Sequence, residues 1–553
     1  MNKKPKTLLI RIPEYPFPYQ KTKVGPSLTP TINFLLPLGA ISIATYAREK
    51  GGHCVEILDL NISIKKRIAL SIHDNLLDIV KSELIKKISL FKPDIVGFSA
   101  LFPNDDKWTF YCAEIVKSCN SEITTLVGGG LATVETKKVL LNNHIDYAVL
   151  GEGEIVFNNF LNSWPDKKLL SEIKGLAFKE DNKIVINERE KLIKDLDSIP
   201  IPNIDLVPTK YYDTDLFHLF SSRGCPFNCK FCVSFKIWGK KNRRHSVNRV
   251  ISEIKILRDK YGINRFDFRD DNFTLDSVWL KEFCRGMILE NEKSKAPMKW
   301  GCPNGLMIKT LDIECVKLMH KAGCEEFVIA IESGSERVAK DIIGKSIDYQ
   351  KARLIRNTVK ELGAAFRSFF MIGLPGETKK EIKQTIKFLI TLDSDWSHIS
   401  IFQPFPGTEL YDLAKELGAI SNNTSGTYLS ASLSTKDFSS DEIKQIQYDT
   451  NIKYNFLRNR NLIRKDKKTN LQFYMNQLEK LIESINNHVI AKIALGYLYY
   501  LDENKDKTKY WWEQALQDLK DPVVQEDFNK YLEWKKEEPI KRWREFVGWD
   551  QVR

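Results

Sequence analysis

The chain of 553 residues is longer than one hydrophobic core usually serves, so several domains are expected. With 42% hydrophobic and 28% charged residues, it has the composition of a globular protein that folds without disulfides or structural metals. The net charge of +12 favours anionic ligands, but no Lys/Arg block is interleaved with aromatic residues as in single-strand binders, so nucleic acid is not the expected partner.

No segment is predicted to target or span a membrane. Residues 1–12 begin basic, but the apolar run that follows is too short for a signal-peptide core. Residues 27–46 are uncharged yet are interrupted by Ser, Pro, Asn, Thr and Gly, which argues against a membrane span. We therefore expect a soluble cytoplasmic protein with reduced thiols. Seven of the 10 cysteines are scattered and are predicted to be buried, small apolar side chains: Cys54, Cys112, Cys119, Cys284, Cys302, Cys315 and Cys324.

Short β-rich runs alternate with helical patterns over residues 1–161, which predicts a five-stranded, doubly wound α/β sheet. Such a sheet binds ligands beyond the carboxyl ends of its strands. The three glycines at 128–130 lack the G-x-G-x-x-G context, so a nicotinamide site is not expected. The predicted strands are 7–12, 55–58, 95–99, 124–127 and 147–150, and the predicted helices are 39–50, 75–91, 107–118 and 134–142.

The alternation fades over residues 162–212, which are charged and are interpreted as an extended linker. It resumes in a domain predicted at 213–412, where six strands indicate a partial barrel. The region 413–553 is predicted to be helical. Within it, 489–519 resembles one tetratricopeptide-like helix pair, but a single unit does not predict a repeat domain. The predicted barrel strands are 217–221, 265–269, 298–303, 326–332, 365–372 and 398–402.

Three cysteines form a C-x3-C-x2-C motif, Cys225, Cys229 and Cys232, directly after the first barrel strand. Loops at the carboxyl ends of barrel strands form the active face of such folds. Closed structural zinc needs four ligands, and His245 lies at no usual ligand spacing. An iron–sulfur cubane usually takes four thiolates, so three would leave one iron open to a substrate. We expect an open cluster here.

The C-x3-C-x-aromatic-C pattern resembles that of the radical S-adenosylmethionine (radical SAM) superfamily. The resemblance implies that the open iron of a 4Fe–4S cluster binds the amino and carboxylate groups of S-adenosylmethionine. One electron then cleaves the sulfonium to methionine and a 5′-deoxyadenosyl radical. By the same resemblance, Phe231 would lie against the adenine.

Further motifs are similar to those of the family, strand by strand from 217 to 411. Asp270 and Asp271, after the second strand, would hold the methionine ammonium. Glu332 and Ser333, after the fourth strand, would bind the ribose. The turn after the fifth strand, with Gly373 and Gly376, would let the backbone approach the nucleoside.

The first domain resembles the cobalamin-binding domain that precedes many radical SAM enzymes. The resemblance rests on Leu36-Pro-Leu-Gly39, Lys92-Pro-Asp-Ile-Val-Gly-Phe-Ser99, Val127-Gly-Gly-Gly130 and Gly151-Glu-Gly-Glu154. The alternative is a sheet that only supports the barrel. The resemblance implies cobalamin contacts from Leu38, Gly39, Ser99, Leu101, Phe102, Gly128, Gly129, Gly130, Gly151 and Glu152.

One departure from other cobalamin proteins is that no D-x-H-x-x-G motif follows any strand, so no protein histidine is expected under the cobalt. His53 and His144 are predicted to be surface side chains. The loop at 100–104 is the candidate for the lower face of the cobalt.

By family analogy, the radical removes hydrogen from an unactivated carbon of a small-molecule substrate, which then receives a methyl group from cobalt. A reductant such as flavodoxin or ferredoxin is implied as a partner. The first alternative is a cyclase or ring rearrangement of the anaerobic magnesium-protoporphyrin monomethyl ester cyclase type. The second is a non-catalytic cluster-binding scaffold. No motif identifies the substrate or a general acid or base.

Overall fold

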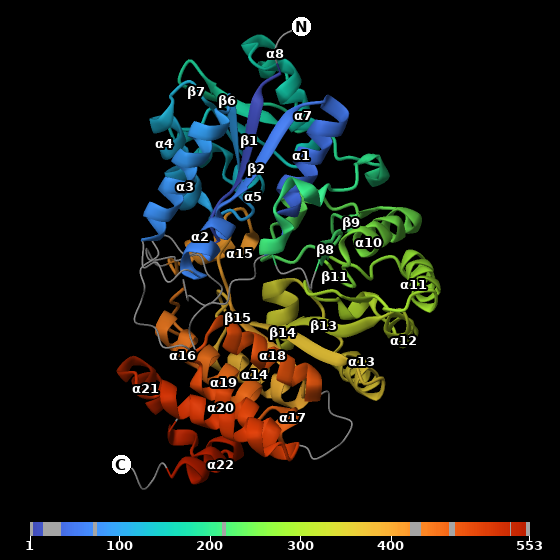
Figure 1. The fold of residues 1–553 in the computed structure, drawn as a ribbon, viewed down its shortest axis with the longest axis vertical. Coiled ribbons are helices and arrows are strands. Elements are labelled where there is room, and N and C mark those ends of the chain that lie inside the picture. Colours follow the sequence, from blue (N-terminus) through green and yellow to red (C-terminus); the bar gives the residue numbers. More distant parts are fainter. Residues whose placement is uncertain are drawn as a thin grey trace. The chain divides into compact units, whose positions relative to one another are not determined.

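The structure is a computed structural model in which the chain divides into two compact units. The first is built from Met1–Tyr19, Asn33–Phe273 and Pro404–Leu413, and the second mainly from Thr274–Gln403 and Ala414–Arg553. Each unit is described by itself (Figure 1). The described residues are 4–14, 35–69, 75–212, 217–420, 433–463, 471–530 and 532–548.

The first unit contains a sheet with the strand order β2-β1-β3-β4-β5-β6-β7. Its first five strands are parallel neighbours and confirm the five predicted strands. The order reverses at β1, between β2 and β3, which is the switch point where doubly wound sheets bind ligands. These strands are β1 (Lys6–Arg11), β2 (Cys54–Asp59), β3 (Ile95–Ser99), β4 (Thr124–Gly128) and β5 (Tyr147–Val149).

The prediction of only five strands is wrong, because β6 (Leu176–Glu180) and β7 (Lys183–Ile186) extend the sheet as antiparallel neighbours. They fall in the segment that we interpreted as an extended linker. Asp181 and Asn182 between them have φ of 48° and 62°, as a tight hairpin turn requires. The domain boundaries themselves stay predictions.

Helices cover both faces of this sheet. Figure 1 shows α3 (Leu76–Phe91) and α4 (Asp106–Cys119) on one side of the strands, and α1 (Leu38–Gly51) and α7 (Gly153–Ser163) on the other. The helix predicted at 134–142 is divided into α5 (Gly130–Val134) and α6 (Thr136–Leu141). Three helices of this region were not predicted: α2 (Leu60–Ala69), α7 and α8 (Lys167–Ser171).

The first unit also holds the beginning of the predicted barrel. The strands β8 (Phe217–Leu219) and β11 (Arg265–Phe268) pair in parallel, and α10 (Val247–Tyr261) precedes β11 in the chain. The short strands β9 (Ser222–Arg223) and β10 (Arg243–Arg244) pair antiparallel. They bracket the cysteine loop and α9 (Ser234–Trp238).

The second unit holds the other four predicted barrel strands, and all four are confirmed as parallel neighbours. A helix precedes each strand along the chain. The strands are β12 (Lys299–Gly301), β13 (Cys324–Glu332), β14 (Ala365–Ile372) and β15 (Trp396–Ile401), and the helices are α11 (Ser277–Glu292), α12 (Ile313–Lys321), α13 (Tyr349–Glu361) and α14 (Lys379–Leu392).

The C-terminal region is helical, as predicted, and has its own core around Tyr474, Trp512 and Trp543. The predicted helix pair is α19 (Val489–Leu501) and α20 (Lys505–Asp518). Their packing is close, because a Cβ on Gly496 would lie 2.3 Å from Trp512. The other helices are α16 (Ser440–Asn451), α17 (Arg460–Ile463), α18 (Leu471–Ser484), α21 (Pro522–Asn529) and α22 (Glu538–Val547).

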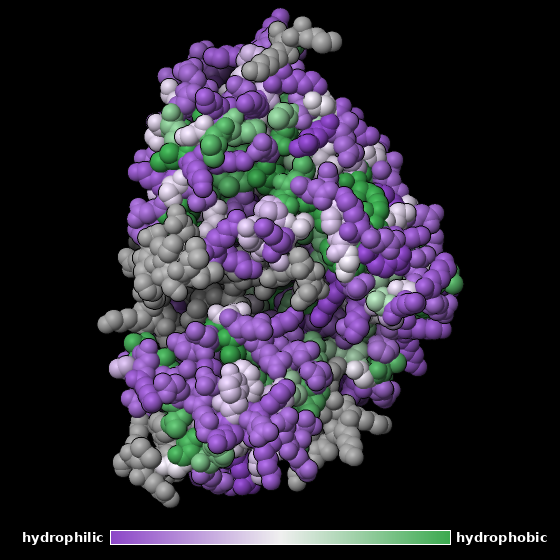
Figure 2. All heavy atoms as spheres, viewed as in Figure 1, coloured by the Kyte–Doolittle hydropathy of each residue, from purple (hydrophilic) through white to green (hydrophobic). Residues whose placement is uncertain are grey.

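Hydrophilic residues cover most of the face shown in Figure 2. In the part of the chain that the structure describes, no helix is both long and apolar enough to span a bilayer.

Candidate functional site

The predicted cobalamin residues after β3 and β4 lie together at the carboxyl edge of the first sheet. Ser99 is paired in register with Gly128. The amide of Ala100 donates to the Gly128 carbonyl at 3.0 Å, and the amide of Leu131 donates to the Ala100 carbonyl at 3.3 Å. Backbone hydrogen bonds therefore hold together the two loops at the sheet edge where the sequence predicts a ligand site.

The three consecutive glycines serve different purposes. A Cβ on Gly129 would lie 2.3 Å from the Ala100 carbonyl oxygen, and a Cβ on Gly130 would lie 2.1 Å from that of Leu101. These two glycines allow neighbouring loops to pack. At Gly128 the nearest atom would be Val149 Cβ at 3.9 Å, and at Gly39, in the first turn of α1, nothing lies within 4 Å. These two positions leave space for atoms of a ligand.

The loop after β3 presents apolar side chains beyond the strand ends. Leu101 is 59% exposed and Phe102 is 37% exposed. The Phe102 ring stacks on that of Phe405 at a centroid distance of 6.3 Å. Burial raises the pKa of Asp105 to about 7, although its carboxylate accepts a hydrogen bond from the Phe102 amide. This loop, predicted to face the cobalt, has an apolar surface suited to a macrocycle.

The prediction that His53 is a surface side chain is wrong. It is 5% exposed, and its Nε2 lies 3.0 Å from Asn162 Oδ1 of α7. Burial lowers its pKa, so the neutral ring is favoured. The reason is that α7, which was not predicted, covers the turn between α1 and β2. His144 is half-buried. The prediction that all the scattered cysteines are buried is wrong for Cys54 and Cys119, which are exposed.

The three motif cysteines lie half-buried on the loop after β9, and none of them forms a disulfide. The amide of Cys232 donates to the Cys229 carbonyl at 2.9 Å, which folds the loop back on itself. Burial raises the pKa of the Cys232 thiol to about 12, with further contributions from Asp271, Cys229 and Cys225. Because Cys229 and Cys225 disfavour ionisation of Cys232, the three thiols need a cation to become thiolates together.

Within the described ranges, no three His, Cys, Asp or Glu side chains converge as the ligands of a single metal ion do. A cubane is larger than one ion and takes cysteines that are spaced more widely. The donor set of three thiols on one loop therefore fits an iron–sulfur cluster. Phe231, between two of these cysteines, is half-buried.

Gly224 allows two backbone segments to cross closely at the start of the cysteine loop. Its φ is +88°, and a Cβ there would lie 2.4 Å from the Lys241 carbonyl oxygen and 3.0 Å from that of Gly239. The Asn242 amide donates to the Gly224 carbonyl at 2.9 Å, which holds the crossing in place. Only glycine satisfies both the left-handed backbone and the close approach.

A buried set of charges that the sequence reasoning missed lies beside this loop. Arg223 Nη2 is 2.6 Å from Glu154 Oε1, and Arg223 Nη1 is 3.1 Å from Glu152 Oε1. Arg243 Nη1 is 2.8 Å from the same Glu152 oxygen. Glu152, predicted to contact cobalamin, also accepts from the Ile193 amide at 2.8 Å. Two features of the sequence could have indicated this set of charges: the arginine before Gly224-Cys225 and the Gly-Glu-Gly-Glu pattern.

The two aspartates predicted to bind the methionine ammonium have partners within the first unit. Asp270 is buried and accepts hydrogen bonds from the Ser221 amide at 2.7 Å and the Ser222 hydroxyl at 2.8 Å. Asp271 accepts from the Ser234 hydroxyl at 2.5 Å. Burial raises the pKa of both carboxyls. Their proposed role toward S-adenosylmethionine stays a prediction.

In the second unit, the predicted ribose residues follow β13. Glu332 has a φ of +66°, which is strained for a residue with a side chain. Its Oε1 lies 2.9 Å from Lys345 Nζ, and the same ammonium donates to the Ala330 carbonyl at 2.7 Å. The Ser333 hydroxyl lies 3.0 Å from that of Thr385. Both predicted residues are thus held rigidly, and their contact with the ribose stays a prediction.

The predicted glycine-rich turn follows β14. Gly373 and Gly376 have φ of +79° and +82°. Glu377 is fully buried, and its Oε2 accepts from the amides of Gly373 and Leu374 at 2.8 and 3.1 Å. Its Oε1 has no hydrogen-bond partner among the described residues. Burial raises the pKa of this carboxyl to about 8.

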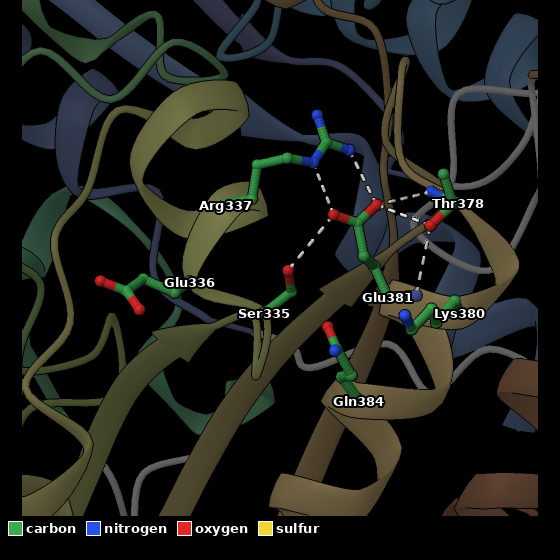
Figure 3. A pocket seen from close by; sticks show the side chains of 7 residues that line it. All are labelled: Ser335, Glu336, Arg337, Thr378, Lys380, Glu381 and Gln384. Atoms are coloured by element: carbon green, nitrogen blue, oxygen red, sulfur yellow. Dashed lines mark hydrogen bonds and ion pairs between the residues drawn. The ribbon is translucent and has the colours of Figure 1, made fainter.

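A pocket of about 390 Å³ opens beside this turn in the second unit (Figure 3). Two of its charged side chains pair with each other, since Arg337 Nε lies 2.6 Å from Glu381 Oε1. The hydrogen bond from Arg337 lowers the pKa of Glu381 to about 2. The side chains that line the pocket do not by themselves indicate a charged ligand. It consists of Ser335, Glu336, Arg337, Thr378, Lys380, Glu381 and Gln384.

Replacing Gly224 by alanine should abolish cluster loading, because the added Cβ meets backbone on the other side of the loop. Iron and sulfide analysis after anaerobic reconstitution measures this. The matched control is Gly262→Ala, where φ is +69° but nothing lies within 4 Å. The control pays only the backbone cost of about 1 kcal/mol and should load normally. Equal loading of the two variants would contradict the prediction.

Glu377→Gln should change how stability depends on pH. The raised pKa means that the folded chain holds this proton more tightly than the unfolded chain, whose pKa is near 4.5. The stabilisation is complete below that value and is lost as pH rises toward about 8. The Tm of the variant relative to wild type should therefore increase between pH 5 and 8. Parallel Tm curves would contradict this prediction.

Two family models match the chain. The model of the radical SAM superfamily matches residues 219–389, and the model of the B12 binding domain matches residues 33–161.

Three relatives each match more than half of this chain. An uncharacterized methyltransferase of Pyrococcus horikoshii is 33% identical over 420 residues, 74% of this chain and 85% of that protein. The cytidylyl-2-hydroxyethylphosphonate methyltransferase of Streptomyces wedmorensis is 28% identical over 59% of this chain and 68% of its own length. The anaerobic magnesium-protoporphyrin IX monomethyl ester cyclase of Rubrivivax gelatinosus is 28% identical over 62% of this chain and 61% of its own length.

Solved structures share the fold. The cobalamin-dependent radical enzyme OxsB, with aqua-cobalamin and S-adenosylmethionine bound, has a TM-score of 0.62 and 14% identity, covering 98% of this chain and 84% of that one. The methyltransferase TsrM of Kitasatospora setae, with tryptophan and a SAM analogue bound, has a TM-score of 0.57 and 17% identity, covering 78% and 80%. The chain therefore belongs to the radical SAM superfamily as a B12-binding enzyme, with a 4Fe–4S cluster, S-adenosylmethionine and cobalamin as its cofactors.

Proposed function

We propose that this enzyme methylates an unactivated carbon of a small molecule. The proposal rests on the observation that the carboxyl edge of the first sheet, where we expect cobalamin, and the cysteine loop belong to one compact unit. The ion pair between Arg223 Nη2 and Glu154 Oε1, at 2.6 Å, joins them. Methyl transfer from cobalt to a substrate radical needs both cofactors to be held in a fixed relation. Relatives named as methyltransferases support the same reaction.

The bound cofactors would supply the radical from one S-adenosylmethionine and the methyl group from another. The products are then 5′-deoxyadenosine, methionine, S-adenosylhomocysteine and the methylated substrate. The chain's part is to bind and orient. Cys225, Cys229 and Cys232 would hold the cluster through three of its irons, which would leave the fourth for S-adenosylmethionine. Gly39 and Gly128 leave room for cobalamin.

The substrate class is proposed by analogy. TsrM binds tryptophan, a small molecule, in a similar fold. A reductant such as flavodoxin or ferredoxin would deliver two electrons per turnover, one for the cleavage of S-adenosylmethionine and one for the remethylation of cobalt. We propose a cytoplasmic location, where such reductants work. Neither nucleic acid nor a membrane has a part in this proposal.

A second candidate is ring closure or rearrangement without methyl transfer. It is favoured by the 28% identity to the anaerobic magnesium-protoporphyrin cyclase. The two candidates differ in one product, because only methyl transfer consumes a second S-adenosylmethionine to form S-adenosylhomocysteine.

Anaerobically reconstituted protein with S-adenosylmethionine and reductant should release 5′-deoxyadenosine, and Cys229→Ala should reduce it to background because the cluster loses a ligand. Mass spectrometry of the products measures both. Cys112→Ala, which removes a buried thiol outside the motif, is the matched control. With the substrate present, deoxyadenosine without S-adenosylhomocysteine would favour the cyclase. No deoxyadenosine from the wild type would favour the scaffold.

Gly128→Ala should weaken cobalamin binding about tenfold while leaving Tm nearly unchanged, because its Cβ fills space that the protein leaves open. Titration of the cluster-free protein with hydroxocobalamin, followed by corrinoid absorbance, measures the affinity. Gly262→Ala, in the same unit, serves as the control. Unchanged affinity would remove Gly128 from the proposed contacts.

A further inference from the structure

Four charged side chains connect two loops of the first unit that are far apart in sequence. Glu152, Glu154 and Arg243 are buried, and the side chain of Arg223 is 13% exposed. Glu152 and Glu154 follow β5 of the cobalamin-type sheet, whereas Arg223 and Arg243 lie in β9 and β10. Five hydrogen bonds of 2.6 to 3.3 Å join the carboxylates to Arg223 and Arg243. The set contains two positive and two negative groups, so it is neutral.

The arginines hold both ends of the cysteine loop. Arg223 stands two residues before Cys225, at the start of the loop. Its guanidinium lies over the ring of Trp238, 5.1 Å from the centroid, at the end of α9. Arg243 donates to the Trp238 carbonyl at 2.9 Å. A shift of either guanidinium therefore moves the start or the end of the loop.

The carboxylates are held just as firmly on the other side. Glu154 accepts from the Ser42 hydroxyl of α1 at 3.0 Å. Gly151, one residue before Glu152, donates its amide to the Thr133 hydroxyl of α5 at 2.9 Å. Burial acts to raise the pKa of Glu154, but Arg223 outweighs it and keeps the pKa below its ordinary value. The carboxylate therefore stays charged.

We infer that Glu152, Glu154, Arg223 and Arg243 are positioning residues that fix the cluster loop against the cobalamin domain and set the reduction potential of the cluster. Reduction adds one negative charge to the cluster, and nearby buried charges act on it with little screening. Because the four charges cancel in the wild type, the potential of the cluster depends on all four being present. Loss of one carboxylate leaves a net positive charge, and loss of one guanidinium leaves a net negative charge.

The test is a redox titration of the reconstituted cluster, followed by electron paramagnetic resonance without substrate. Glu154→Gln should shift the midpoint potential positive, because the surplus positive charge stabilises the reduced cluster. Arg223→Gln should shift it negative. The double variant Glu154→Gln/Arg223→Gln is neutral again and should return close to the wild-type value. A purely structural role would not give shifts of opposite sign.

The control is the pair Arg249 and Glu253, a buried ion pair of α10 at 2.7 Å in the same unit. Arg249→Gln and Glu253→Gln should leave the potential unchanged. If Arg223→Gln fails to load a cluster, Arg243→Gln carries the same net charge and should also shift the potential negative. Shifts of the same sign for Glu154→Gln and the arginine variant, or shifts no larger than the controls, would overturn the inference.

The inference does not depend on methyl transfer, since the potential is measured on the cluster alone. If the protein proves to be a cyclase, the opposite shifts are still expected. If methylation is observed without them, only the role of the four charges is lost.

Discussion

Glu154 remains charged in the protein interior chiefly because the guanidinium of Arg223 lies against it. Removing one member of such a pair leaves an uncompensated buried charge at a cost of about 3–5 kcal/mol. The pair also joins the first turn of α7 to the strand that leads into the cysteine loop. The relative position of two cofactor loops in the first unit therefore depends on electrostatic pairing rather than on apolar packing.

Much of the fold could be predicted because parallel strands are buried on both faces and read as short apolar runs. All 11 predicted strands are present, five in the N-terminal sheet and six in the barrel region. The hairpin β6–β7 escaped prediction because its residues are mixed and half-exposed and its turn is Asp181-Asn182 rather than Asn-Gly. His53 was misjudged because its burial depends on α7, a distant element.

The candidate site was predictable in kind but not in detail. The spacing of the cysteines predicts a cluster loop, since few other functions use three thiols in this way. Sequence could not separate Gly128, which leaves space, from Gly129 and Gly130, which allow the backbone to pack. Nor could it assign the oxygens of Glu152, since its arginine partners lie 71 and 91 residues away. Such pairings exist only once the chain has folded.

The left-handed backbone at Glu332 limits how this position can change during evolution. Glycine would relieve the backbone strain there. It would also remove the carboxylate that neutralises Lys345, whose side chain is only 6% exposed. The backbone at position 332 therefore favours glycine, whereas the charge of Lys345 requires a carboxylate there. Drift at position 332 thus requires a compensating change at position 345, so the two sites should vary as a pair.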